Sequence, residues 1–213
     1  MSVLPPKLTD PHDLVIKTAV PNAQHLKRDF QYMRVRGMEL EIPIPAIPTS
    51  TTSDIQKPDW SFVRKLWWKM IDLVYGTAAS PLRLSLEMRI MGDSDIIMAP
   101  QRGNKLGTVA IEIGTVPEVV GDDEWAYFCQ MAFDILRGLG PEGRVRPHWG
   151  KEWFGLHMDN LSAPQWIKTF SYKSDIAEFK ETLQKIGTRQ GWTLKDLQQS
   201  FSNRLWDEII FDT

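Results

Sequence analysis

The sequence has little cysteine and no long apolar run. Cys129 is the one cysteine in 213 residues, so no disulfide can form within the chain, and a chain of this length buries a core without one. No stretch approaches the ~18 apolar residues that a membrane-spanning helix needs, and the opening letters MSVLPPKLTDPHDL lack the apolar run of a signal peptide. We therefore expect a cytoplasmic protein without a membrane partner.

Charge of one sign is also not in excess. The chain carries 25 Lys and Arg against 27 Asp and Glu, a formal net charge of -2. The basic residues are scattered among acidic ones, whereas a nucleic-acid-binding surface concentrates them in a patch or stripe. The sequence therefore predicts no nucleic-acid partner.

Several common catalytic motifs are missing as well. No G-x-S-x-G and no P-loop occurs. The histidines show no metal-ligand spacing, so no metal site is predicted. They are His12, His25, His148 and His157. The run GLGPEG at Gly138–Gly143 matches G-x-G-x-x-G, but it follows a helical pattern and Pro141 removes a backbone donor. We expect a helix end and a turn there, not a dinucleotide site.

The patterns that are present predict an α+β fold. Period-two alternation or short apolar runs favour strands, and apolar residues spaced three and four apart favour helices. Strands are expected at 38–45, 81–90, 93–100 and 106–116; helices are expected at 59–76, 122–138, 162–170, 174–187 and 194–210. Ser162 and Ser174 are placed to cap two of these helices. A Pro, Ser and Thr loop at 46–58 is the best candidate for a mobile segment.

Together these elements predict a mainly antiparallel sheet with amphipathic helices covering one face and a polar site on the other. An irregular lead-in is expected over residues 1–30, and a single substrate-binding domain over residues 31–213.

Polar side chains gather on the face that the helices leave open. In PLRLSLEMRI the leucines alternate with polar residues, so the latter leave one face together. These are Arg83, Ser85, Glu87 and Arg89, joined by Glu112 from the next strand, and by Glu39 and Glu41 if all strands share one sheet. Glu87 and Arg89 lie two residues apart and can touch one ligand, the carboxylate accepting and the guanidinium donating hydrogen bonds.

If Glu112 lies level with Glu87, two carboxylates share a site and one carboxyl pKa is expected to rise. The alternatives are a solvated face and a structural ion-pair network.

The segment RVRPHWGKEW, Arg144 to Trp153, combines two arginines, a histidine, a lysine and a glutamate with two tryptophans. Polar donors beside aromatic surface are typical of a pocket that excludes water while orienting a substrate. A surface turn with Trp149 tucked into the core is the alternative.

The two segments PLRLSLEMRIMGDSDIIMAPQ and RVRPHWGKEW resemble the C-terminal part of the aldonolactone oxidases. These flavoenzymes include the arabinono- and gulono-lactone oxidases and alditol oxidase. RGMELEIPIP resembles the first strand of that region and FSNRLWDEIIF its closing segment, so the resemblance runs from about Phe30 onward.

The resemblance implies that this chain is the cap, or substrate, half of such an enzyme, whose sheet faces the flavin. It assigns Glu87 and Arg89 to the substrate-orienting pair and Lys151 to the lysine beside flavin and substrate. His148 and Trp149 would line or support the site. At the strand position where relatives present a histidine or threonine, this chain has Glu112 or Gly114.

The flavin domain of the family has no counterpart in these 213 residues. We therefore expect no cofactor bound by this chain alone, with FAD reaching the site through a partner domain.

Three functions follow as hypotheses. The first is the substrate half of a flavin-dependent oxidoreductase acting on a hydroxyl or lactone. The second is a cofactor-independent cyclase, isomerase or lyase, with Glu87 or Glu112 as general acid/base, Arg89 stabilising negative charge and Lys151 assisting. The third is a non-catalytic binding scaffold that uses the open sheet face as a homodimer interface. The partners implied are a small-molecule substrate and either a flavin domain or a second copy of the chain.

Overall fold

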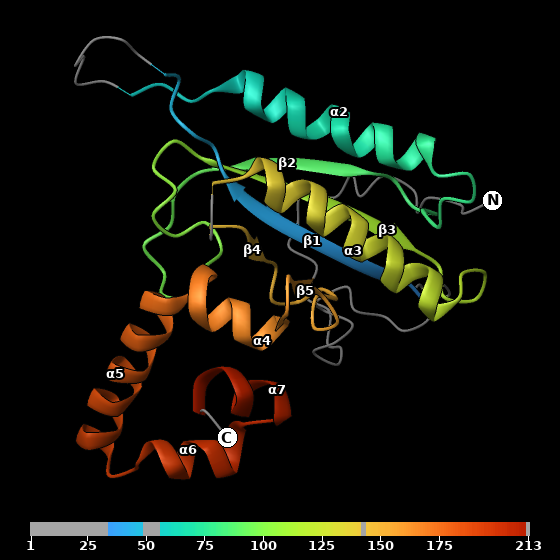
Figure 1. Cartoon of the computed structure of the whole chain (residues 1–213). Coiled ribbons are helices and arrows are strands. Elements are labelled where there is room, and N and C mark those ends of the chain that lie inside the picture. The colour runs from blue at the N-terminus through green and yellow to red at the C-terminus, as the bar shows by residue number, and fades with distance from the viewer. Residues whose placement is uncertain (1–33, 49–55, 142–143, 212–213) are drawn as a thin grey trace, which may run out of the picture. The chain divides into compact units, whose positions relative to one another are not determined.

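Four strands form an antiparallel sheet in the order β2-β3-β1-β4 (Figure 1). They are β1 (Arg36–Pro43), β2 (Glu87–Met91), β3 (Thr108–Thr115) and β4 (Arg146–Pro147). The computed structural model describes residues 34–48, 56–141 and 144–211, and Val35–Thr213 forms one compact unit. The expected lead-in and the central part of the expected mobile loop, residues 49–55, lie outside the described residues. The predicted α+β class with a mainly antiparallel sheet is confirmed.

One face of the sheet is apolar and buried. The register pairs Met38 with Ile113, Leu40 with Ile111 and Ile42 with Val109, so the apolar residues of both central strands point to the same side. Each of these six side chains is at most 1% exposed. This face is the main contact surface for the helices, and it forms the centre of the core.

Two helices, α2 (Trp60–Gly76) and α3 (Asp122–Leu139), cover the apolar face (Figure 1). Helix α2 begins after Asp59, whose carboxylate accepts hydrogen bonds from the backbone N–H groups of Ser61 and Phe62 at 2.9 and 3.3 Å. Helix α3 carries three acidic residues in its first turn, which stabilise the positive end of the helix dipole. Both helices therefore start where local sequence signals predict.

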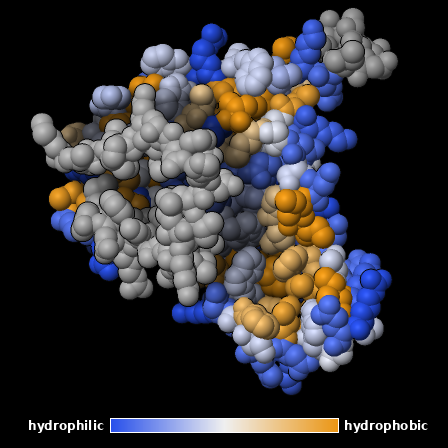
Figure 2. Space-filling model, turned by 180° about the vertical axis from the view of Figure 1, so that it is seen from behind, coloured by the Kyte–Doolittle hydropathy of each residue, from blue (hydrophilic) through white to orange (hydrophobic). Residues whose placement is uncertain are grey.

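The C-terminal third of the chain forms two short strands and a series of helices. The helices lie below β1 in Figure 1, on the side away from α2. The strands β5 (His157–Met158) and β6 (Leu161–Ser162) make a hairpin. They are followed by α4 (Ala163–Trp166), the π-helix η2 (Ile167–Ser171), α5 (Lys173–Gln190), α6 (Leu194–Phe201), α7 (Arg204–Trp206) and the π-helix η3 (Asp207–Phe211). Hydrophobic surface lies among these last helices in the lower part of Figure 2.

The caps and ends of these helices confirm one expectation and correct two. Ser162 is the N-cap of α4, as predicted, and forms a capping box with Gln165. Ser174 is not a cap, because α5 already begins at Lys173 after Tyr172. The single helix expected at 194–210 is interrupted at Ser202, where the backbone is extended and a new N-cap, Asn203, begins α7.

The prediction of a strand at 93–100 is wrong. The segment forms turns and one isolated bridge, and Met98 has a positive φ of 67° that a regular strand does not allow. Its apolar run, Ile96 to Met98, lacks the alternation that identifies the other strands. The indole of Trp149 donates to the Met98 carbonyl at 2.8 Å, which shows how a distant residue fixes this turn.

The strand expected at 81–90 begins only at Glu87. Before it, the N–H groups of Arg83 and Leu84 both donate to the Gly114 carbonyl at 3.2 Å, so residue-by-residue pairing fails there. Leu84 lies over Gly114, where a Cβ would meet the Leu84 Cδ1 atom at 3.0 Å. The face to which Leu84 points is therefore not the one that the alternation predicts.

Among the described residues, no helix has both the length and the apolar character needed to cross a membrane.

Candidate functional site

Arg89 lies at the centre of a polar cluster on the sheet face opposite α2 and α3. Its Nη1 atom lies 2.7 Å from Glu39 Oε1, and its Nη2 atom lies 3.0 Å from Glu87 Oε2 and also donates to Glu112. The register places Glu112 directly opposite both Glu39 and Glu87. Three glutamates on three neighbouring strands thus stand level, and one guanidinium offsets their repulsion.

Lys151 reaches the same cluster from the loop after β4. Its ammonium group forms an ion pair with Glu112. The loop is held along the edge of β1, where the His148 N–H donates to the Glu39 carbonyl at 3.0 Å and the Glu152 N–H donates to the Gly37 carbonyl at 2.8 Å. We call Glu39, Glu87, Arg89, Glu112 and Lys151 the Arg89 cluster.

Gly37 makes room for this arrangement. A Cβ at Gly37 would lie 3.2 Å from Glu112 Oε1 and 3.6 Å from Lys151 Cδ. The carboxylate and the lysine stem therefore occupy the space that a side chain on β1 would fill. A glycine at this position on β1 lets a strand residue and a loop residue meet over the sheet.

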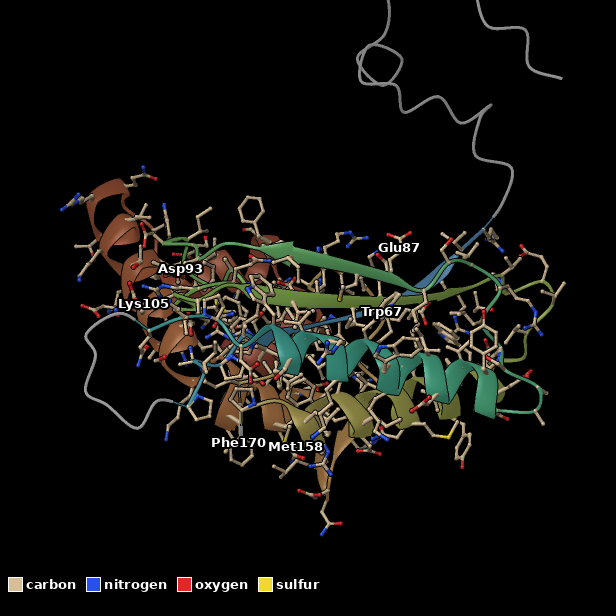
Figure 3. All side chains as sticks on the ribbon, turned by 90° about the horizontal axis from the view of Figure 1, so that it is seen from above. Trp67, Glu87, Asp93, Lys105, Met158 and Phe170 are labelled. Carbon is tan, nitrogen blue, oxygen red and sulfur yellow. The ribbon has the colours of Figure 1, made fainter. Side chains whose placement is uncertain are left out.

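The cluster is exposed at one end and buried at the other. The exposed fractions of the side chains are 52% for Glu87, 44% for Arg89 and 31% for Lys151, but 15% for Glu112 and 2% for Glu39. Figure 3 shows Glu87 at the outer edge of the sheet, on the side away from Trp67 and helix α2. A molecule that arrives from solvent therefore meets Glu87 and Arg89 first.

Glu41 extends the cluster into the interior. Its side chain is fully buried, and its Oε2 atom accepts a hydrogen bond from Gln101. Among the described residues, Glu41 Oε1 and Glu39 Oε2 are buried oxygens without a hydrogen-bond partner. Burial and the neighbouring charge of Glu39 raise the pKa of Glu41 to about 7. Glu41 is thus a carboxyl group that exchanges its proton near neutral pH.

The pKa of Glu112 shifts in the opposite direction to that of Glu41. Burial acts to raise its pKa, but the hydrogen bonds from Lys151 and Arg89 outweigh burial, so the pKa of Glu112 lies below its ordinary value. The pKa of Arg89 is raised, chiefly by its hydrogen bond to Glu112. The sequence predicts a raised carboxyl pKa where Glu112 meets Glu87. For Glu112 this prediction is wrong, because two cations reach it.

Among the described residues, the side chains of four further predicted substrate-binding residues form no hydrogen bond to the Arg89 cluster, and three of them make other contacts. The Arg83 guanidinium donates to the carbonyls of Ser80 and Leu82 at 2.5 and 3.1 Å. Ser85 precedes β2, and no hydrogen bond joins it to the cluster within the described ranges. The imidazole Nδ1 of His148 accepts from the Gly150 N–H at 3.1 Å. The structure thus brings Glu87, Arg89, Glu112 and Lys151 together, while Arg83 and His148 make other contacts and Ser85 precedes the strand.

The fourth, Trp149, belongs to an aromatic cluster. Its ring centroid lies 4.7 Å from that of Tyr172, 5.4 Å from that of Trp206 and 5.5 Å from that of Trp153. Arg146 stacks on Tyr172 at 4.5 Å and forms an ion pair with the buried Asp175 at 2.7 Å. Most of the segment Arg144 to Trp153 therefore packs between the sheet and the C-terminal helices, while Lys151 contributes to the Arg89 cluster.

Glu39 and Glu41, expected on this face if all strands share one sheet, and Gln101, which the sequence did not indicate, complete the site. The alternation of β1 indicates the side to which both glutamates point, but not how deeply they are buried. Gln101 has no sequence signal, since it lies just after the segment 93–100, whose expected strand does not form. Within the described ranges, no group of three or more His, Cys, Asp or Glu residues has the geometry to hold a metal ion.

No protein-family model matches this chain, and no curated protein matches its sequence. Its function must therefore be inferred from the geometry of the cluster and from the sequence resemblance stated above.

Proposed function

We propose that this chain is the substrate-binding half of an aldonolactone-oxidase-like oxidoreductase. It holds a hydroxylated or lactone substrate at the exposed end of the Arg89 cluster, and another chain supplies the flavin. The observation that carries the proposal is the convergence of Glu87, Arg89 and Lys151, which come from an edge strand and a distant loop, around the single carboxylate of Glu112. The resemblance assigns a role at the substrate to the same three residues.

The chemistry of the cluster suits a hydroxyl group, which both donates and accepts hydrogen bonds. Arg89 and Lys151 present donors, and Glu87 and Glu112 present acceptors. The lowered pKa of Glu112 keeps its carboxylate ionised at neutral pH, so it remains an acceptor. Glu112 can thus accept hydrogen bonds from substrate hydroxyls as a carboxylate.

The described residues do not fit the flavin itself. The flavin pyrophosphate needs a glycine-rich loop with free backbone N–H groups. Gly140, in the run Gly138–Gly143, instead packs closely against neighbouring side chains. A Cβ there would lie 3.0 Å from Ile42 Cγ2 and 3.1 Å from Val145 Cγ2. Hydride acceptance therefore belongs to the chain that binds the flavin. We place both chains in the cytoplasm.

Binding measurements on the purified chain test this proposal. D-arabinono-1,4-lactone and xylitol serve as probes in isothermal titration calorimetry, with Glu87→Gln as the test variant and Glu181→Gln as the control. Glu87 is half exposed, so its replacement leaves no buried charge unpaired, and Glu181 is an exposed partner of Lys185 on α5. We expect about tenfold weaker binding for Glu87→Gln, the loss of one charge-assisted hydrogen bond. Equal affinities for both variants, or no binding of either probe, would contradict the proposal.

A second candidate is a cofactor-independent acid/base enzyme, and one observation favours it. Glu41, with a pKa of about 7, lies beside a row of ionised groups that includes Glu112 and Arg89. Incubating the lactone with the chain in the absence of flavin tests it by product analysis. Turnover that Glu112→Gln abolishes would favour this function over the first; no turnover would remove it.

A further inference from the structure

Strand β2 is the outermost strand of the four-stranded sheet. Within the described ranges, β3 pairs with it on one side and no strand pairs with it on the other. Figure 3 shows Glu87 at this edge. An open strand edge is a template for pairing with another chain. Which chain fits depends on the backbone groups and side chains that β2 presents outward.

The hydrogen bonds of β3 determine which backbone groups of β2 are open. The Ile44 N–H donates to the Gly107 carbonyl at 2.9 Å, one step beyond the register of β1 and β3. In an antiparallel pair, every second residue bonds to a given neighbouring strand. The odd-numbered residues of β3 therefore bond to β1, and the even-numbered ones bond to β2. The Leu84 N–H, which donates to the Gly114 carbonyl at 3.2 Å, agrees with this assignment.

Two residues of β2 thus direct their N–H and C=O groups outward. The even-numbered residues of β3 lie opposite Glu87 and Arg89, so the backbone groups of these two point inward. Met88 and Ile90 alternate with them and point their backbone groups to the open edge. Their side chains are 38% and 45% exposed. The edge therefore combines open backbone groups with apolar side chains that the helices leave partly uncovered.

The charges of β2 are complementary to those of a second copy of the same strand. Antiparallel pairing centred on Met88 places Glu87 of each copy opposite Arg89 of the other. Leu86 then lies opposite Ile90 of the other copy. A shift of the centre by one residue in either direction places two glutamates or two arginines opposite one another, which is destabilising. The charges thus favour a single register.

We propose that two copies of this chain associate through β2, which joins their sheets into one continuous antiparallel sheet. The interface is the strand edge, so the polar face of the sheet stays open in both copies. Arg89 of the second copy lies beside Glu87, at the exposed end of the Arg89 cluster. Each copy therefore adds a cation to the Arg89 cluster of the other.

The association is expected to be weak. Five residues at about 3.4 Å each give a strand pair about 17 Å long. A contact of this length buries less surface than the roughly 1,200 Å² of a standard complex, so we expect a dissociation constant between about 1 µM and about 1 mM. The dimer therefore forms at high protein concentration and dissociates on dilution.

Sedimentation velocity of the purified full chain at increasing concentrations tests the association. Met88→Lys is the test variant, because it places two lysines opposite one another at the centre of the interface. Ile186→Lys is the matched control, because Ile186 on α5 is 40% exposed and Met88 is 38% exposed. Circular dichroism checks that both variants remain folded. We expect Met88→Lys to weaken the dimer at least about tenfold and Ile186→Lys to leave it unchanged.

Disulfide trapping tests the register. Met88→Cys puts two thiols opposite one another with Cα atoms about 5.5 Å apart, within the range of a disulfide, and oxidised glutathione accepts the two electrons that they lose. Ile90→Cys is the matched variant, because its two thiols lie four residues apart along the strand pair, roughly 14 Å, which is too far. Cys129 is buried and does not compete.

We expect Met88→Cys to form a covalent dimer and Ile90→Cys to remain largely monomeric. A chain that stays monomeric at about 1 mM would overturn the inference. So would a dimer that Met88→Lys does not weaken, since its interface would lie elsewhere. Equal trapping of the two cysteine variants would overturn the register. None of these assays contains a lactone, so their results are independent of the proposed function.

Discussion

Replacement of Glu41 by Gln should make the protein more stable above neutral pH. The carboxyl group is fully buried, and its pKa rises from the ordinary 4.5 to about 7. Because the folded state holds this proton more tightly than the unfolded state, its contribution is fully favourable below pH 4.5 and is lost as the pH rises through about 7. Above that pH the protein carries a buried charge at full cost.

The size of this cost follows from the two pKa values. At about 1.4 kcal/mol for each pH unit, the difference between 4.5 and about 7 corresponds to about 3 kcal/mol of unfolding free energy. Gln has nearly the same shape and no charge. Its amide oxygen can still accept the hydrogen bond from Gln101. We therefore expect a gain of up to about 3 kcal/mol at high pH and little gain in acid.

Urea unfolding followed by tryptophan fluorescence measures this difference at a series of pH values. Glu181→Gln, at an exposed position on α5, is the control for loss of one negative charge. A Glu41→Gln variant whose stability falls with pH as steeply as that of the wild type would refute the reasoning. So would a variant that is less stable than the wild type at about pH 8, where the ionised carboxylate should be costly.

Three further substitutions test the packing. Gly37→Ala puts a Cβ 3.2 Å from Glu112 Oε1, so calorimetry should show weaker lactone binding, with unfolding free energy lowered by about 1 kcal/mol. Arg146→Met leaves the buried carboxylate of its partner, 2.7 Å away, without this cation, and urea unfolding should show a loss of about 3 kcal/mol. Gly187→Ala puts a Cβ 2.7 Å from the ring of Trp192, and a loss of about 2 kcal/mol is expected in the same assay. A variant with the wild-type unfolding free energy would contradict the contact from which its loss of stability is predicted.

The elements with a clear period could be predicted from the sequence. The helix expected at 59–76 is observed at Trp60–Gly76, because its apolar spacing and its Asp59 cap are both local signals. The alternation around Glu87 and Glu112 likewise gives the correct face for both residues. What alternation cannot give is register, since pairing between strands some 20 residues apart depends on the turn between them.

The failures occur where distant parts of the chain decide the structure. The run from Ile96 to Met98 has strand-forming residues, but the Trp149 indole holds it as a turn. The direction of Leu84 changes because Gly114 opens a space beside it. The pKa of Glu41 is raised by burial and by Glu39, against the lowering effect of Gln101, and alternation along one strand reveals neither burial depth nor these neighbours.

A hydroxylated substrate that binds at the exposed end of the Arg89 cluster should change the NMR signals of the residues there. The most direct measurement is a titration of the ¹⁵N-labelled chain with D-arabinono-1,4-lactone, followed by the backbone and arginine Nε–H signals in NMR spectra. The largest shifts should occur at Glu87, Arg89, Glu112 and Lys151. Shifts confined to the C-terminal helices, or no shifts at saturating lactone, would contradict binding at the Arg89 cluster.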